Sequence, residues 1–105
     1  MRVYQFSKFS NQVSQSLALA AYRPAINQRL RDLAGLVNFG GQTIVVSAAA
    51  KTSILQAAGS NMTNATHIYE IGIGGHWRIF FAPSPGGSII ALLIGHLQGN
   101  VLQEP

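Results

Sequence analysis

The segment Gly75-His76-Trp77-Arg78-Ile79-Phe80-Phe81 decides the fold prediction for this chain. Aromatic and β-branched residues dominate it, which favours a β-strand. Gly74 and Gly75 predict a two-residue hairpin loop to an earlier strand at 67–73. The turn-forming run 83–87 leads to 88–97, whose continuous apolar run is typical of a strand buried in the middle of a sheet. The last third of the chain is therefore predicted to form a three-strand antiparallel meander.

The N-terminal part is predicted to add a short strand and two amphipathic helices. β-favouring residues at 3–6 predict an outer strand, and Ser7 is expected to cap the first helix. Apolar side chains then recur at helical spacing in two stripes, at Phe9, Val13, Leu17 and Ala20 and at Ile26, Leu30, Leu33 and Val37. Pro24 suits the first turn of the second helix, and Gly40-Gly41 is expected to end it.

The middle stretch, 42–64, supports two interpretations. The β-branched run 43–46 favours a strand, and Ala48–Ala58 favours a helix that stops at Gly59. One continuing helix is the alternative, and 59–61 with Asn64 is expected to be a loop. Either way, the order of elements predicts an α+β fold in one domain spanning residues 1–105.

The hairpin loop also predicts which side chains share a face of the sheet. With Gly74-Gly75 as the loop, Ile71 would lie opposite Arg78 and Tyr69 opposite Phe80. The face expected to pack under the helices then carries Trp77, Ile79, Phe81, Ile68 and Glu70. The other face is expected to carry His76, Arg78, Phe80, Tyr69, Ile71 and Ile73. A register shift of one residue would separate Arg78 from Tyr69.

Composition narrows the function classes. Only 10% of residues are charged, against 48% apolar, so we expect exposed apolar surface that a partner protein covers. Seven Lys and Arg against three Asp and Glu give a net charge of +4, which favours an anionic partner such as nucleic acid, although an uninformative surface is equally compatible.

Several kinds of site are not expected. The chain has no cysteine, so thiolate metal sites, disulfides and cysteine nucleophiles are excluded, and a cytoplasmic location is compatible. The three histidines lack metal-ligand spacing and the three acids are far apart, so we expect no metal and no cofactor. No apolar run approaches the ~20 residues of a membrane span.

The segment 69–81 resembles the RelE/ParE toxin superfamily of type II toxin–antitoxin systems. In that family a Glu-hydrophobic strand is followed by Gly-x-(Tyr/Trp)-Arg-hydrophobic-x-(Phe/Tyr), which Glu70-Ile71 and 75–81 match. The opening run 3–9 and the late strand 89–96 are also similar to the family. The chain departs from it in lacking the usual basic C-terminal tail and in having a longer, more apolar segment at 42–64.

The resemblance implies a metal-independent endoribonuclease that blocks translation. Arg78 matches the family's strand arginine, whose implied role is to hold the scissile phosphate. His76 and His96 are the available acid–base groups, because imidazole titrates near neutral pH. Each residue also has a purely structural explanation: an arginine exposed on the sheet or paired with Glu70, and histidines that are capping or surface residues at strand ends.

Five further residues are candidates for RNA binding. Tyr69 could stack on a base, Lys8 and Lys51 could each contact a phosphate, and Arg29 with Arg31 could grip the backbone. An ordinary half-buried strand tyrosine and solvated surface cations are the simpler explanations.

The predicted partners are a cognate antitoxin and RNA or the ribosome, with no membrane and no metal. One alternative is a ParE-like toxin that cleaves nothing and inhibits DNA gyrase by binding it. A second alternative is a non-catalytic interaction domain whose apolar surface serves assembly.

Overall fold

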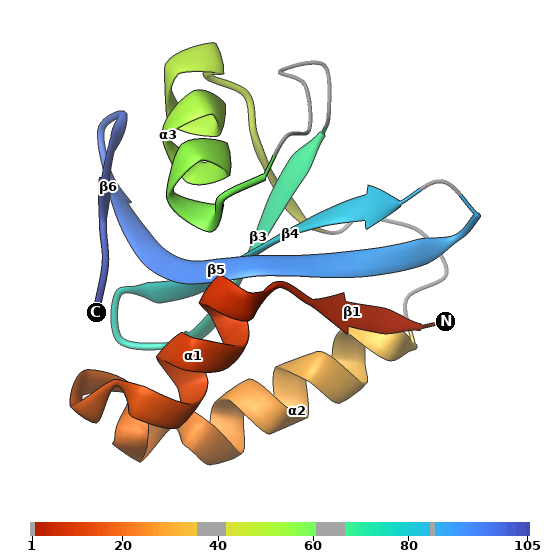
Figure 1. Cartoon of the computed structure of the whole chain (residues 1–105), viewed down its shortest axis with the longest axis vertical. Helices are drawn as coiled ribbons and strands as arrows, with labels where there is room; N and C mark the ends of the chain where they lie inside the picture. The colour runs from red at the N-terminus through yellow and green to blue at the C-terminus, as the bar shows by residue number, and fades with distance from the viewer. Residues whose placement is uncertain (1, 36–41, 61–66, 85) are drawn as a thin grey trace.

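A computed structural model describes residues 2–35, 42–60, 67–84 and 86–105. Its elements, in chain order, are β1 (Val3–Gln5), α1 (Ser7–Gln15), the 3-10 helix η1 (Leu17–Tyr22), α2 (Arg23–Ala34), β2 (Thr43–Val45), α3 (Ala48–Ala58), β3 (Ile68–Gly74), β4 (Trp77–Ser84), β5 (Ser88–Gln98) and β6 (Val101–Gln103). The α+β class predicted from the sequence is confirmed (Figure 1). The strand β2 and the helix α3 occupy the middle stretch for which two interpretations were open, and the short strand β6 was not predicted.

The described strands form one sheet in the order β1-β5-β4-β3-β2, and β6 pairs with the far end of β5. β1 runs parallel to β5, whereas the other pairings are antiparallel. Helices α1 and α2 lie against one face of the sheet, and α3 lies against the other (Figure 1). The predicted positions of the outer N-terminal strand and the buried last strand of the meander are both confirmed.

Each face of the sheet buries its own apolar cluster. On the side of α1 and α2 the buried helical side chains are Phe9, Leu19, Ile26 and Leu33, and they meet Ile73, Ile79, Phe81, Ile89, Ala91 and Ile94 of the sheet. On the side of α3 the cluster contains Ile54, Leu55, Ile68, Phe80, Leu92 and Leu93. Consecutive residues Leu92 and Leu93 reach the same cluster because the pairing of β4 with β5 shifts between Phe80 and Phe81.

The first helix ends earlier than predicted. Ser16 takes an extended conformation (φ −76°, ψ 121°) that stops α1 at Gln15, and the chain continues as the 3-10 helix η1. This break changes the helical phase, so Leu17 is 91% exposed and Leu19 is buried instead. The predicted burial of Leu17 and Ala20 is therefore wrong. The N-cap is Phe6, without a side-chain cap bond, and not Ser7.

The second helix agrees with its predicted start but not with its predicted end. Pro24 lies in the first turn of α2, and the helix ends at Ala34 with Gly35 as its C-cap. Val37 and Gly40-Gly41, which the sequence assigned to its last turn and its end, lie outside the described residues.

The middle stretch is a strand followed by a helix, the first of the two interpretations. Ser47 caps α3 by accepting a hydrogen bond from the Ala50 backbone N–H. Gly59 ends the helix in the left-handed conformation (φ 71°), and the Ser60 N–H donates to the Leu55 carbonyl. The loop predicted at Asn61 and Asn64 lies outside the described residues.

The predicted register of the β3–β4 hairpin is wrong by one residue. Gly74 pairs with Trp77, so the loop is Gly75-His76, and a shift between Gly72 and Gly74 places Tyr69 opposite Phe81. Gly74 (φ 116°) and Gly75 (φ 57°) both have left-handed conformations, so local turn chemistry alone did not select between the two loops.

This register redistributes side chains between the two faces of the sheet. The predicted packing of Trp77, Ile79 and Phe81 under α1 and α2 is confirmed. Tyr69, Ile71 and Ile73 were predicted to face away from α1 and α2, but they pack on the same side as these helices. Ile68 belongs to the α3 cluster, and Glu70 pairs with Phe80 of that cluster. Tyr69 and Arg78 are therefore on opposite faces.

Helix α1 also completes the hydrogen bonding of β5. The Gln12 Nε2 group donates to the Ile94 carbonyl (2.9 Å), and its Oε1 accepts from the Ile94 N–H (2.6 Å). β5 pairs with β1 at 89–91 and with β6 at 96–98, so Ile94 lies between these two stretches. The side chain of Gln12 thus supplies at Ile94 the two bonds that a neighbouring strand would otherwise make.

We expect Gln12→Leu to lower the free energy of unfolding by about 2–4 kcal/mol, since two backbone groups of a buried residue lose their partners and each costs about 1–3 kcal/mol. Urea unfolding measures the change. Gln15→Leu on the same helix is the matched control, because Gln15 is exposed and its substitution should change stability by no more than about 0.5 kcal/mol. Equal losses in the two variants would contradict the role of Gln12.

Candidate functional site

Two of the predicted acid–base residues meet at the hairpin end of the sheet. The ring centroids of His76, in the β3–β4 loop, and His96, on β5, are 4.9 Å apart with an interplanar angle of 63°. The His76 ring also lies 4.4 Å from that of Trp77. Because β5 lies beside β4, with Gly95 opposite Arg78, His96 reaches the loop from the neighbouring strand. We refer to His76 and His96 below as the histidine pair.

Tyr22 supports the loop from the helical side. A Cβ atom on Gly75 would lie 2.9 Å from the Tyr22 hydroxyl oxygen, and one on Gly74 would lie 3.2 Å from its ring. Gly74, at the end of β3, and Gly75, in the loop, therefore each satisfy two requirements. Each has a left-handed backbone conformation, and each lies too close to the Tyr22 side chain for a Cβ atom of its own. Tyr22 is not among the site residues predicted from the sequence. Its aromatic character at the end of an apolar run was the available signal.

Arg78 lies flat over the backbone of β3. Its guanidinium group occupies the space next to Gly72, where a Cβ atom would be 3.4 Å from Nη1. The same Nη1 donates to the carbonyls of Trp77 (3.0 Å) and Gly75 (3.3 Å). Neither Arg78 nor Glu70 has an ion-pair partner in the described part of the chain, so the alternative that they pair with each other is wrong.

Arg29 is a structural link between α2 and β3. Its Nε donates to the Gly72 carbonyl (2.9 Å), and its Nη1 makes an ion pair with Asp32 (2.8 Å). The Gln28 amide and then the Arg29 guanidinium, both hydrogen-bonded to Asp32, hold the pKa of that carboxyl below its usual range. Arg31 is exposed and donates to Gln28 (2.9 Å). Arg29 and Arg31 thus take part in one network on α2.

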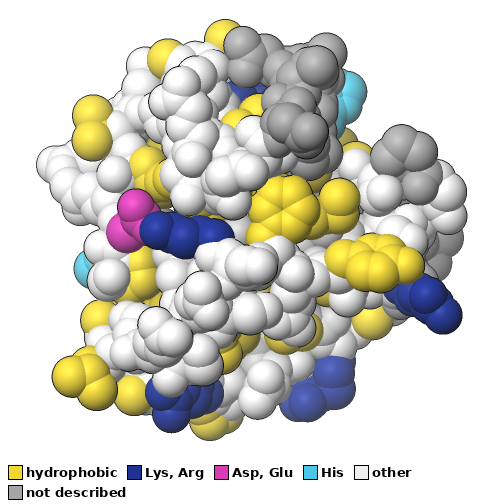
Figure 2. Space-filling view, in the orientation of Figure 1, with side chains coloured by type: hydrophobic (Ala, Val, Ile, Leu, Met, Phe, Trp, Pro, Cys, Tyr) yellow, Lys and Arg dark blue, Asp and Glu magenta, His cyan; other side chains and the backbone are white. Residues whose placement is uncertain are grey.

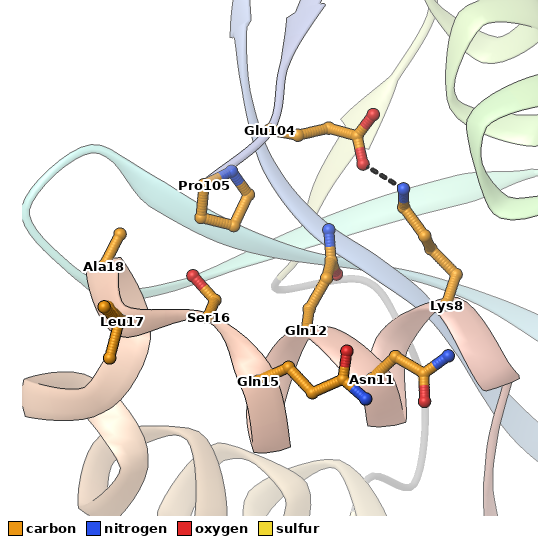
Figure 3. A pocket seen from close by; sticks show the side chains of 9 residues that line it. All are labelled: Lys8, Asn11, Gln12, Gln15, Ser16, Leu17, Ala18, Glu104 and Pro105. Carbon is orange, nitrogen blue, oxygen red and sulfur yellow. Dashed lines mark ion pairs between the residues drawn. The ribbon is translucent and has the colours of Figure 1, made fainter.

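The remaining predicted cations are separated from one another. Lys8 on α1 makes an ion pair with Glu104, beside an open hollow of about 600 Å³ between α1 and the C-terminal residues (Figure 3). Lys51 belongs to α3, on the opposite face of the sheet from α2. Lys and Arg side chains accordingly stand at separate points of the surface in Figure 2 and form no common patch there.

Tyr69 is half-buried and stacks on Phe81, with ring centroids 5.8 Å apart and an interplanar angle of 23°. It packs with Leu33 of α2 in the same cluster. The simpler explanation of Tyr69, a half-buried strand tyrosine, therefore agrees with this environment, and it does not share a surface with Arg78.

The site was also compared with what a bound metal ion would need. The described residues contain no cluster of three or more His, Cys, Asp or Glu side chains able to hold a metal ion. None of the described helices is long and apolar enough to cross a membrane.

Comparisons with protein-family models, with curated proteins and with solved structures find no match to this chain.

Strand β6 lies beside the histidine pair because Gly95 has no side chain. His96 pairs with Gln103 of β6. A Cβ atom on Gly95 would lie 2.7 Å from Leu102 Cδ1 and 3.0 Å from the Gln103 carbonyl oxygen. The second contact is with backbone, so a side chain at this position would push β6 away from β5.

We expect Gly95→Ala to cost about 1–3 kcal/mol of stability, the usual range for overpacking, and to accelerate amide hydrogen exchange at 96–103. Exchange measured by mass spectrometry locates the change. Gly35→Ala is the control, since a Cβ atom there meets nothing closer than 3.6 Å. Unchanged exchange at 96–103 in Gly95→Ala would show that β6 tolerates the methyl group.

Proposed function

We propose that this chain is an RNA-cleaving toxin of a toxin–antitoxin pair, of the RelE/ParE type, and that it acts without a metal ion. The observation that carries the proposal is the 4.9 Å separation of the His76 and His96 rings. Both were predicted separately as acid–base groups, and they lie 20 positions apart in the sequence. Their proximity supports a shared task at one phosphodiester.

The chemistry requires two proton carriers. One imidazole takes the proton of the ribose 2′-hydroxyl while O2′ attacks phosphorus, and the other, as imidazolium, protonates the leaving O5′ as the P–O5′ bond breaks. The products are a 2′,3′-cyclic phosphate and a 5′-hydroxyl, so no water or metal is consumed.

Arg78 is the proposed phosphate ligand. Both of its hydrogen bonds to backbone carbonyls come from Nη1, so its Nε and Nη2 donors remain for a phosphate group. A guanidinium group favours the extra negative charge that develops on the phosphoryl oxygens during attack. Of the other predicted RNA contacts, Arg31 and Lys51 remain candidates, whereas Arg29 serves mainly to hold β3.

The order of the elements supports the family proposal. A short strand and a helical pair precede the meander, as the resemblance implies. The insertion of β2 and α3, and β6 in place of a basic tail, are the departures. We propose that a cognate antitoxin covers exposed apolar side chains such as Leu17, Val46 and Val101.

One observation favours the alternative toxin, which binds DNA gyrase and cleaves nothing. The cations expected to grip RNA do not form a patch: Lys8 is paired with Glu104, and Arg29 is bound to Gly72 and Asp32. The test of function therefore measures RNA cleavage and gyrase supercoiling in parallel.

We expect the purified protein to cleave RNA, with or without ribosomes, in excess EDTA. His76→Gln and His96→Gln should each lower the rate by about 10²–10⁴-fold, the range for loss of one acid–base group. Arg78→Ala should lower it by about 10²–10³-fold, the range for loss of one group that stabilises the transition-state charge. Gel analysis of a labelled RNA measures the rate, and the cyclic phosphate is identified by mass spectrometry.

His67→Gln is the matched control, because His67 is exposed at the other end of β3, about 20 Å from the loop at the usual rise of a strand. Its cleavage rate should equal that of the wild type. Intact RNA together with blocked supercoiling would favour the gyrase toxin. Absence of both effects, and of growth arrest on expression, would leave the interaction domain.

A further inference from the structure

The two imidazole rings of the histidine pair lie at the surface of the molecule. His76 is exposed and His96 is half-exposed, and neither imidazole has a hydrogen bond or ion pair with any described residue. Their recorded neighbours are each other and, for His76, the Trp77 ring. Both rings therefore have nitrogen atoms free to bind a ligand from solution.

We infer that His76 and His96 form a two-imidazole binding site for a borderline transition-metal ion, with Cu²⁺ bound most tightly. Metal–nitrogen bonds to histidine are about 2.0–2.1 Å long, which places the centroids of two imidazoles on one ion about 5 Å apart. The observed separation is 4.9 Å. The rings stand edge to face, and the exposed His76 side chain has room to turn its ring toward an ion that His96 also binds.

The chemistry of the pair defines the class of ion. Imidazole suits Cu²⁺, Ni²⁺ and Zn²⁺, and affinity rises to a maximum at Cu²⁺ in the first-row series. Mg²⁺ and Ca²⁺ prefer oxygen ligands and are not expected to bind. Because the described residues offer no third His, Cys, Asp or Glu nearby, water completes the coordination, and the ion exchanges freely instead of holding the fold together.

Trp77 provides a direct probe of this site. It is the single tryptophan of the chain, and its ring lies 4.4 Å from that of His76. The open d shells of Cu²⁺ and Ni²⁺ quench an excited indole at such a distance, whereas the filled shell of Zn²⁺ does not. Zn²⁺ in excess should therefore displace Cu²⁺ and restore the fluorescence.

The experiment titrates the full chain with Cu²⁺ and records tryptophan fluorescence. We expect saturable quenching at one ion per chain, no quenching by Mg²⁺, and recovery with excess Zn²⁺. His76→Gln and His96→Gln should each weaken binding about 10-fold or more, and His67→Gln should bind as the wild type does. Quenching that is unchanged in either variant of the pair would overturn the site.

A second measurement needs no variant. Paramagnetic Cu²⁺ at a small fraction of the protein concentration should broaden the imidazole proton resonances of His76 and His96 and leave those of His67 sharp. Equal broadening of all three histidines would show nonspecific binding and would also overturn the site.

The metal site and the proposed nuclease can fail separately. Binding is read from fluorescence and resonance broadening, so it stands even if the chain cleaves nothing. If the chain does cleave RNA through the histidine pair, saturating Cu²⁺ should stop cleavage and EDTA should restore it. Bound Cu²⁺ with undiminished cleavage would overturn the catalytic role of the pair but not the metal site.

Discussion

The structure depends on one constraint, which is that β5 must pair every backbone polar group while both of its faces are buried. Four different elements meet this requirement. β4 pairs along most of one edge, while β1, the Gln12 side chain of α1 and β6 supply bonds at 89–91, Ile94 and 96–98. Helix α3 takes no part in this pairing and covers the apolar side chains of β5. An unpaired amide in such a strand would cost as much as several apolar contacts contribute.

This arrangement also determines where chemistry can occur. Over most of its length β5 is covered by helices, so its polar side chains lie at its two ends, with Ser88 at the start and His96 and Gln98 at the far end. His96 is the first polar residue after the apolar run, and the β3–β4 loop brings His76 to it. Tyr22 and the two loop glycines then fix the loop against the helices, so the rigid sheet carries the exposed rings.

The parts of the fold that local patterns encode were predictable. Continuous apolar residues identified β5, aromatic and β-branched residues identified β4, and Gly59 marked the end of α3. The hairpin register was not predictable, because Gly74 and Gly75 both accept left-handed conformations. Either Gly74-Gly75 or Gly75-His76 can therefore form the loop. The extended backbone conformation of Ser16 ends α1 and changes which later side chains face the core. The spacing of apolar residues in the sequence did not predict this break.

The candidate site shows the same division. His76, His96 and Arg78 were found by residue type and resemblance. Their spatial relations depend on how β4 aligns with β5 across a shifted register, which local sequence does not specify. The predicted cations do not come together, because Lys8 lies on α1, Lys51 on α3, and Arg29 and Arg31 on α2, and only the tertiary fold determines how far apart these helices are.

The pairing of β1 with β5 has a consequence for biosynthesis. Val3 pairs with Ile89, 86 positions later, so a nascent chain holds its first strand without a partner until almost the whole meander has left the ribosome. Contacts of such long range make folding slow, and an unpaired strand invites aggregation. The sheet around β5, and with it the surface formed by the far end of this strand, is completed only after β5 itself has left the ribosome. That surface is consequently absent from the emerging polypeptide until β5 has paired with β1.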